Sequence, residues 1–457
     1  MHHRSHPYSL RKRAVKAGLL TIAGLGLSVT IRFGSNLLMT RLLAPEMFGV
    51  MAIASTVLFG LAMFSDMGLK QNVVQSARGN EAIYLNTVWT IQILRGAILF
   101  LVGITVSLII FFLNSFGKMS AHSVYATPVL PYVIAFLSIA AIVQGFESTK
   151  LHEASRQLSF GRITLIDLLA QVVGLIGMVS WAFVDRSIWA LVAGGFLSAV
   201  TKAILSHAYL SGNSNRLHWD SAIFWEIFRF GKWIFLSSVI GFLVLNGDRL
   251  ILGGLVSSET LGIYVVAYLL AATADLVLSK AAADISLPAF SEIVRERPAQ
   301  LRATYYKLHA IAASSSYFCS GFLMIGGQAV VSLLYDSRYA QAGWMLQILS
   351  VGLLTVPFRL ATECFVALGK PQVASVVSVV RLMTLFTLTP AGFALFGLTG
   401  ALWGIVLSNL SWVPIQIFFK IRFGLFALKN ELFPIGFSIL GLLTGWAFNR
   451  AIELLHG

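Results

Sequence analysis

Apolar runs recur along the whole of this sequence, and their length limits the fold more than any other feature. A helix needs about 20 mostly apolar residues to cross roughly 30 Å of hydrocarbon, and most of the runs reach that length. Apolar residues make up 57% of the 457 residues and charged residues only 11%, a composition far from that of a soluble domain. We therefore predict an all-α polytopic membrane protein.

About thirteen runs satisfy this length rule. The first is expected to be a retained helix, because it is too long for the core of a signal peptide. The loops between the runs are short and leave no room for a catalytic domain. The predicted spans are 17–42, 47–68, 84–113, 129–147, 163–184, 188–209, 233–256, 261–287, 308–335, 342–368, 372–395, 398–419 and 432–450.

Basic residues give the expected orientation, because cytoplasmic loops carry an excess of lysine and arginine. When the loops are assigned alternately to two sides, twenty-one basic residues fall on one side and five on the other. The richer side includes the N-terminal segment 1–16, which we therefore place in the cytoplasm. The net charge of +14 is thus topological and does not indicate a nucleic-acid partner.

A weak internal repeat suggests two lobes of six helices each. The segment Leu42–Gly49 matches Leu255–Gly262 at an offset of 213 residues, and Ala190–Leu191 matches Ala401–Leu402 at an offset of 211. Parallel repeats of this kind are related by an axis along the membrane normal, which would place a central cavity between the lobes. We expect a basic N-terminus (1–16), a first lobe (17–210), a cytoplasmic amphipathic linker (211–232), a second lobe (233–420) and an extra hydrophobic segment (421–457).

Several arginines interrupt the apolar runs, and each is a candidate for function because a charge inside a membrane is costly. Arg32 and Arg249 lie deepest in their predicted spans. Arg32 also belongs to a polar stripe with Asn36 at helical spacing, although an arginine that only bonds neighbouring carbonyls would explain it too. The candidate ligands for an anionic cargo are Arg32, Asn36, Arg95, Arg249, Arg359 and Arg381.

Three acidic residues inside the runs are candidates for ion coupling, namely Asp248, Asp275 and Glu363. Asp275 could bind a cation or pair with an arginine of another helix, and Glu363 could simply neutralise Arg359 one turn away. The five arginines against three acids leave a net charge of +2. This excess favours a phosphate-bearing cargo over a cationic drug, because the arginine fork binds phosphate oxygens in pairs.

The sequence contains no nucleotide-binding G-x-x-x-x-G-K-[ST] loop and no metal motif, so we expect neither cofactor nor metal. Cys319 and Cys364 lie in apolar runs and suggest no disulfide or zinc site. Two G-x-x-x-G spacings, at Gly400 with Gly404 and at Gly441 with Gly445, are typical of close helix packing.

Five motifs in the same order resemble those of the polysaccharide transporters (Wzx-like, PST family) of the multidrug/oligosaccharidyl-lipid/polysaccharide (MOP) exporter superfamily. Together they extend over both predicted lobes. They are Thr40–Gly49 (TRLLAPEMFG), Asp66–Leu69 with Val73–Gln75, Thr87–Gln92 with Arg95–Gly96, Phe230–Phe235 (FGKWIF) and Asn246–Gly253 (NGDRLILG). Members of this family have twelve or fourteen spans, so thirteen departs from the pattern near the C-terminal region.

The resemblance implies a flippase, with no enzymatic activity, in a bacterial inner membrane. Its cargo would be an undecaprenyl-diphosphate-linked oligosaccharide for O-antigen, capsule or exopolysaccharide, moved by alternating access coupled to H⁺ or Na⁺. The lipid tail would stay among the membrane lipids while the arginines bind the diphosphate. A polysaccharide polymerase and a chain-length regulator would be its protein partners.

Two other classes stay open from the sequence. The first is a multidrug or other lipid exporter of the same superfamily, because a fold does not determine a cargo. The second is a membrane polysaccharide polymerase or ligase, which would be expected to carry a large polar loop outside the membrane. The positive interior argues against the first class, and the short loops argue against the second.

Overall fold

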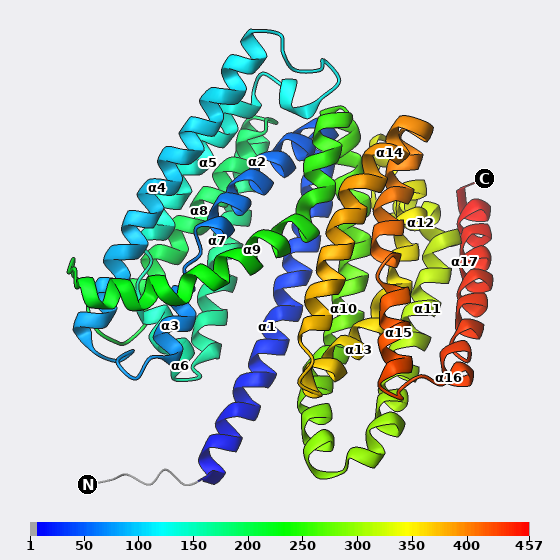
Figure 1. Cartoon of the computed structure of the whole chain (residues 1–457). Coiled ribbons are helices and arrows are strands. Elements are labelled where there is room, and N and C mark those ends of the chain that lie inside the picture. The colour runs from blue at the N-terminus through cyan, green and yellow to red at the C-terminus, as the bar shows by residue number, and fades with distance from the viewer. Residues whose placement is uncertain (1–6, 457) are drawn as a thin grey trace. The chain divides into compact units, whose positions relative to one another are not determined.

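The computed structural model describes the backbone of residues 7–456, and within this part the chain forms helices and no strands (Figure 1). The side chains of 7–22, 230, 232–234, 236, 280–285 and 455–456 lie outside the description, as does most of the predicted basic N-terminus. The chain divides into two compact units, the first unit Met1–Phe242 and the second unit Leu243–Gly457. Each unit is described separately below.

Eight helices lie wholly in the first unit. The first predicted span and the polar stripe belong to α1. The predicted span 129–147 corresponds to α5, and the short helix α6 that follows it is bent by 62° relative to α5. The helices are α1 (Pro7–Leu42), α2 (Pro45–Phe64), α3 (Leu69–Gln75), α4 (Ala82–Ser115), α5 (Leu130–Gly145), α6 (Lys150–Arg156), α7 (Phe160–Val184) and α8 (Trp189–Ala208).

Helix α9 (Ser221–Leu255) crosses the division between the units, and eight helices follow it in the second unit. The longest of these are α10 and α14, each of 39 residues. The helices are α10 (Ser258–Glu296), α11 (Leu301–Leu334), α12 (Ala342–Ser350), α13 (Val356–Ala367), α14 (Gln372–Leu410), α15 (Val413–Arg422), α16 (Leu428–Leu432) and α17 (Ile435–His456).

Ten helical segments of the described chain are long and apolar enough to cross a membrane, or eleven if α5 and α6 count as one broken span. One of the ten, Gln372–Arg422, contains two predicted spans, because the backbone of α14 turns at Phe396 (φ −134°) and Gly397 (φ 60°). Beyond this turn, a Cβ on Gly400 would lie 2.0 Å from the carbonyl oxygen of Gly392, so the two arms pack as a hairpin. The chain is a multi-pass membrane protein.

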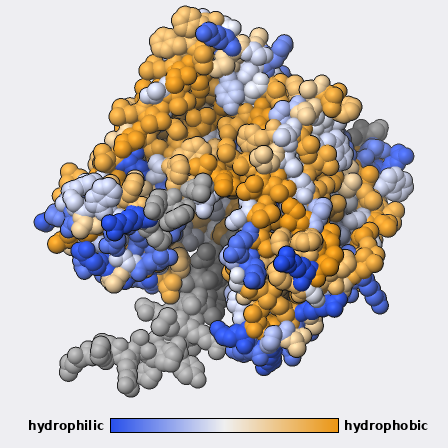
Figure 2. Space-filling model, viewed as in Figure 1, coloured by the Kyte–Doolittle hydropathy of each residue, from blue (hydrophilic) through white to orange (hydrophobic). Residues whose placement is uncertain are grey.

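Exposed apolar side chains cover the sides of the helices, as expected where lipid replaces water as the solvent. On the face shown in Figure 2, hydrophobic residues dominate the flanks of the helices, and hydrophilic residues gather around the loops. Exposed examples are Leu101, Phe112, Ile176, Ile439 and Leu443. In water, the protein would aggregate through this apolar surface, whereas the hydrocarbon of a membrane solvates it.

The helix boundaries repeat along the chain at the offset that the sequence suggested. Helix α1 ends at Leu42 and α2 begins at Pro45. Helix α9 ends at Leu255 and α10 begins at Ser258, so both boundaries recur after 213 residues. The division between the units, however, falls after Phe242 rather than at 233.

The predicted linker 211–232 is not a separate element. Its second half is the start of α9, because the aromatic segment 221–232 continues as a helix into the next apolar run without a breaking proline. Exposed Trp219, Trp225 and Phe228 keep the interfacial character that the sequence indicated.

The predicted extra segment 421–457 packs inside the second unit as α16 and α17. Helices α11 and α17 approach each other at glycines, which confirms the packing predicted for the second G-x-x-x-G pair. A Cβ on Gly441 would lie 2.2 Å from the carbonyl oxygen of Phe318, and a Cβ on Gly445 would lie 2.5 Å from that of Phe322.

We expect Gly441→Leu to separate α17 from α11 and to lower the free energy of unfolding by roughly 1–3 kcal/mol, the usual range for overpacking. Gly436→Leu on the same helix is the matched control, because a Cβ there meets no atom within 4 Å. Thermal unfolding of both variants in detergent checks this expectation. Equal midpoints would show that the glycine contact does not hold α17 in place.

Candidate functional site

The candidate site residues fall into two groups, one in each unit, and the larger group lies in the second unit. There Asp248 and Arg249 lie on α9, Asp275 on α10, and Arg359 on α13. Arg381 on the first arm of α14 interacts electrostatically with Arg359, Asp248 and Asp275. We call these five residues the arginine cluster. They bring three guanidinium groups and two carboxylates together, which leaves one excess positive charge.

Arg359 makes the central ion pair of the arginine cluster. Its Nη1 donates to Asp275 Oδ2 at 2.9 Å and to the hydroxyl of Ser279, one turn further along α10, also at 2.9 Å. The side chains of Arg359 and Asp275 are 43% and 29% exposed, so both can be reached from outside the protein core. Of the two alternatives for Asp275, this structure contains the pair with an arginine of another helix.

The local pair that the sequence allowed between Arg359 and Glu363 does not form among the described residues. The guanidinium of Arg359 already bonds Asp275 and Ser279 on α10. Pro357 does not kink a long helix. It lies in the first turn of α13, where a proline is tolerated, directly after the 3₁₀ turn Val351–Thr355.

Two tyrosines complete the arginine cluster and were missed by sequence reasoning. Tyr264 donates a short hydrogen bond to buried Asp248, and the guanidinium carbon of Arg249 lies 4.7 Å from the ring centre of Tyr268. Asp248 and Arg249 therefore use different partners, as expected for adjacent helical residues. The spacing of Tyr264, Tyr268 and Asp275 along one face of α10 was a signal that could have found the tyrosines.

Polar atoms inside the arginine cluster remain without partners among the described residues. These atoms are the Nε atoms of Arg249 and Arg381 and Oδ1 of Asp248, all buried. Buried polar groups are normally hydrogen-bonded. Unused donors on two neighbouring arginines are suited to an anionic group that enters from outside.

The second group lies in the first unit and is not a single site. Arg32 is exposed on α1, Asn36 is half-buried one turn later, and Arg95 lies on α4. Arg95 donates to Ser65 Oγ at 2.9 Å and to the carbonyl oxygen of Ala62 at 2.6 Å, both at the end of α2. Its guanidinium also lines a cavity of about 580 Å³.

Two further acidic residues of the first unit have local partners. Asp66 lies just beyond the end of α2 at Phe64 and accepts from the backbone N–H of Gly68 at 2.9 Å. Asp167 on α7 pairs with Lys202 on α8 at 2.9 Å. Lys202 was not among the predicted candidates.

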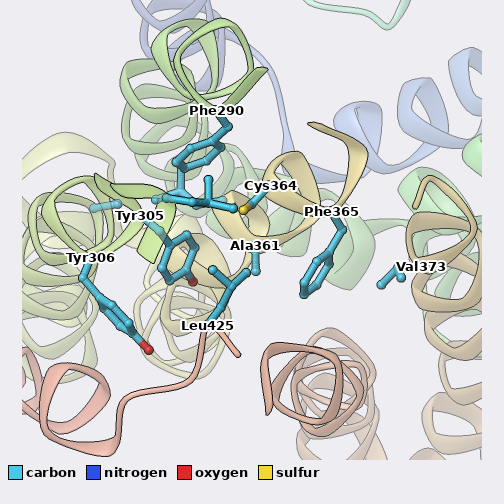
Figure 3. Packing of buried hydrophobic residues seen from close by; sticks show 11 residues of the cluster. Phe290, Tyr305, Tyr306, Ala361, Cys364, Phe365, Val373 and Leu425 are labelled. Atoms are coloured by element: carbon cyan, nitrogen blue, oxygen red, sulfur yellow. The ribbon is translucent and has the colours of Figure 1, made fainter. Parts of the chain in front are cut away.

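A buried charged cluster in the second unit was also missed. Lys420 lies just beyond the predicted span 398–419, yet its side chain is fully buried and pairs with Glu431 on α16. Glu431 also accepts from Tyr306 at 2.7 Å and lies 3.4 Å from His309. The cluster borders an apolar core that Figure 3 shows around Tyr305, Tyr306, Cys364 and Leu425. Neither residue spacing nor composition in one sequence predicts that residues of two separate helices pair in this way.

Two solved structures have the same arrangement of helices. The lipid II flippase MurJ, in an inward closed conformation, superimposes with a TM-score of 0.70 at 10% identity, over 96% of this chain and 97% of that chain. An inward-facing multidrug resistance MATE family transporter superimposes with a TM-score of 0.65 at 16% identity, over 93% and 95%. This chain therefore shares the fold of these two membrane transporters.

The family model described as "polysaccharide biosynthesis protein" matches residues 38–344. The chain belongs to this family. It is 22% identical over 353 residues to the lipopolysaccharide biosynthesis protein WzxC of Escherichia coli K12. The aligned region covers 76% of this chain and 68% of WzxC. It is also 22% identical over 336 residues to the succinoglycan biosynthesis transport protein ExoT of Rhizobium meliloti, over 73% of this chain and 64% of ExoT.

Proposed function

We propose that this protein is a flippase that moves an undecaprenyl-diphosphate-linked oligosaccharide across a bacterial inner membrane, with its N-terminus in the cytoplasm. The observation that carries the proposal is the arginine cluster, which has three arginines on membrane-spanning helices, two of them, Arg249 and Arg381, with an unused buried donor. Arginine stays charged in this environment and its planar fork matches two phosphate oxygens. The names of WzxC and ExoT support a role in polysaccharide biosynthesis and transport.

A multidrug exporter would share this fold, so the cargo depends on the charges. A cationic drug requires an acidic or aromatic site, whereas the arginine cluster has one excess positive charge. Both carboxylates of the cluster are also engaged, Asp275 by Arg359 and Asp248 by Tyr264. The arginine cluster thus supports an anionic cargo.

The pair of Arg359 and Asp275 supplies a route for coupling to H⁺ or Na⁺. A diphosphate that binds Arg359 competes with Asp275 for the same guanidinium. The released carboxylate then gains affinity for a cation or a proton, because its neutralising partner is occupied. Cargo and ion would be linked through one side chain, with Asp248 and Glu363 as further candidates for the ion.

The proposal is tested in a strain that lacks this gene and carries the variant gene on a plasmid. The deletion strain should lose surface polysaccharide and accumulate the lipid-linked oligosaccharide inside. A polymerase and a chain-length regulator would act on the exported repeat and should remain functional. Normal surface polysaccharide in the deletion strain would refute the function.

We expect Arg32→Ala and Arg249→Ala to reduce export while the protein remains inserted, because each removes a charge able to bind phosphate. Arg249→Lys should rescue only partly, since a lysine keeps the charge and loses the bidentate geometry. Surface polysaccharide, normalised to membrane-inserted protein, is the measurement. Export at the wild-type level in both alanine variants would exclude these two arginines from cargo binding.

A further inference from the structure

The first unit contains a polar cavity, and none of the residues that line it belongs to the arginine cluster. The cavity has a volume of about 580 Å³, which lies within the range of small-molecule sites. It is lined by residues of α2, α4, α5 and α8 and of the short helices α3 and α6. Its polar lining consists of Asp66, Lys70, Gln71, Gln92, Arg95, Gln144, Glu147, His152, Ser198 and Lys202.

The charges of this cavity balance. Three cations line it, Lys70, Arg95 and Lys202, and two carboxylates line it as well. Lys202 is also held by a third carboxylate, Asp167, at 2.9 Å. A balanced site gives no net attraction to a diphosphate, in contrast to the arginine cluster. The cavity of the first unit therefore presents charged hydrogen-bond donors and charged acceptors side by side.

Amide and hydroxyl groups extend this mixture of donors and acceptors. The side chains of Gln71 and Gln144 are exposed in the cavity, and neither has a side-chain partner among the described residues. Ser198 on α8 adds a hydroxyl to the lining. Sugar hydroxyls both donate and accept, so they need partners of both kinds at close spacing.

Hydrogen bonds hold the walls of the cavity in place. Gln92 Nε2 donates to the carbonyl oxygens of Gln144, Gly145 and Glu147 at 3.1, 3.2 and 3.0 Å, which fixes the chain where α5 ends. Arg95 ties α4 to the end of α2. A preorganised site loses less conformational entropy when a ligand binds.

We propose that this cavity binds a sugar of the cargo's oligosaccharide, while the arginine cluster of the second unit binds the diphosphate. The sugar site rests on the proposed function, because it assigns a place to another part of the same cargo. The ligand class is a neutral polyhydroxylated ring. The cavity would thereby contribute selectivity for the repeat unit.

Gly195 on α8 allows the cavity to be filled with little disturbance of the fold. It lines the cavity, and a Cβ at this position meets no atom within 4 Å. Gly195→Leu should weaken sugar binding at least tenfold. Gly436→Leu on α17 is the matched control, because its Cβ also meets no atom within 4 Å and it lies in the other unit.

A second variant, Gln144→Leu, removes an exposed amide at nearly constant size. We expect it to weaken sugar binding by about tenfold, the effect of one or two lost hydrogen bonds. Because the Gln144 side chain has no partner among the described residues, the fold does not depend on it.

The experiment measures binding to the purified full-length protein in detergent by equilibrium dialysis. One probe is the free oligosaccharide repeat, cleaved from the strain's own polysaccharide, and the other is inorganic pyrophosphate. We expect Gly195→Leu and Gln144→Leu to lose affinity for the oligosaccharide and to retain affinity for pyrophosphate, while Gly436→Leu binds both like wild type. Retained pyrophosphate binding shows that the second unit is folded, and a thermal unfolding midpoint equal to that of wild type shows the same for the first unit.

Wild-type affinity for the oligosaccharide in both Gly195→Leu and Gln144→Leu would overturn the sugar site, and so would a wild-type protein that binds only pyrophosphate. Either result leaves the proposed function intact if the deletion strain still fails to export polysaccharide. Normal export by the deletion strain would instead refute the function itself. The two failures are therefore distinguishable.

Discussion

Arg359→Ala is expected to reduce polysaccharide export by roughly 10- to 100-fold, the effect of losing one charge-assisted contact worth about 1.5–3 kcal/mol. The substitution removes the guanidinium that holds Asp275 and Ser279 and that we assign to the diphosphate. It also leaves the carboxylate of Asp275 unpaired on a membrane-spanning helix. Export is measured as surface polysaccharide, normalised to inserted protein.

Three companion variants separate cargo binding from charge balance. Arg359→Lys should retain part of the activity, because it keeps the pair with Asp275 but loses the planar fork. Asp275→Asn should still bind pyrophosphate yet export poorly when the ion gradient drives transport. Glu292→Gln is the matched control, because Glu292 is an exposed acid on α10, the helix that carries Asp275, and has no part in the arginine cluster. Export by Arg359→Ala equal to that of Glu292→Gln would contradict the role of Arg359.

Lys420→Met is expected to lower the free energy of unfolding by about 3–5 kcal/mol, because it leaves the largely buried carboxylate of Glu431 without its cation. The Lys420 side chain is 0% exposed and that of Glu431 is 12% exposed, so water cannot replace the lost partner. Lys429→Met is the matched control, since Lys429 is exposed on α16, the short helix that carries Glu431. Thermal unfolding in detergent measures both.

The double variant Lys420→Met with Glu431→Gln tests the electrostatic origin of this effect. The neutral amide no longer needs a cation and can still accept from Tyr306, so the double variant should regain much of the stability. A double variant as unstable as Lys420→Met alone would show that the lost packing of the lysine stem, rather than its charge, was responsible. Equal midpoints for Lys420→Met and Lys429→Met would mean that the buried pair does not stabilise the unit.

The membrane spans could be predicted from the sequence because each depends on a local property. The thickness of the hydrocarbon layer sets the length of a span, and every backbone group in it must bond within its own helix. The runs 233–256 and 163–184 accordingly correspond to α9 and α7. Gly441 and Gly445 were likewise found by spacing, because helices in lipid approach closely where side chains are small.

The interior arginines were identified as unusual by the same local argument, since a charge in an apolar run needs a reason. Their partners could not be derived in this way. Glu363, one turn away, was one possible partner of Arg359, but Arg359 binds Asp275 and Ser279 on α10. Lys420 lies just beyond the predicted span 398–419, although the return of the chain through α16 buries it against Glu431.

The amino-acid sequence by itself thus determined that this chain crosses a membrane repeatedly as helices and carries excess positive charge inside. Helix length, apolar composition and the cost of a buried charge are properties of single segments. Only the tertiary structure decided which charges pair, and that polar residues of five separate helices line one charge-balanced cavity in the first unit. Those facts depend on how the helices pack against one another. The sequence pattern of a single helix does not give this packing.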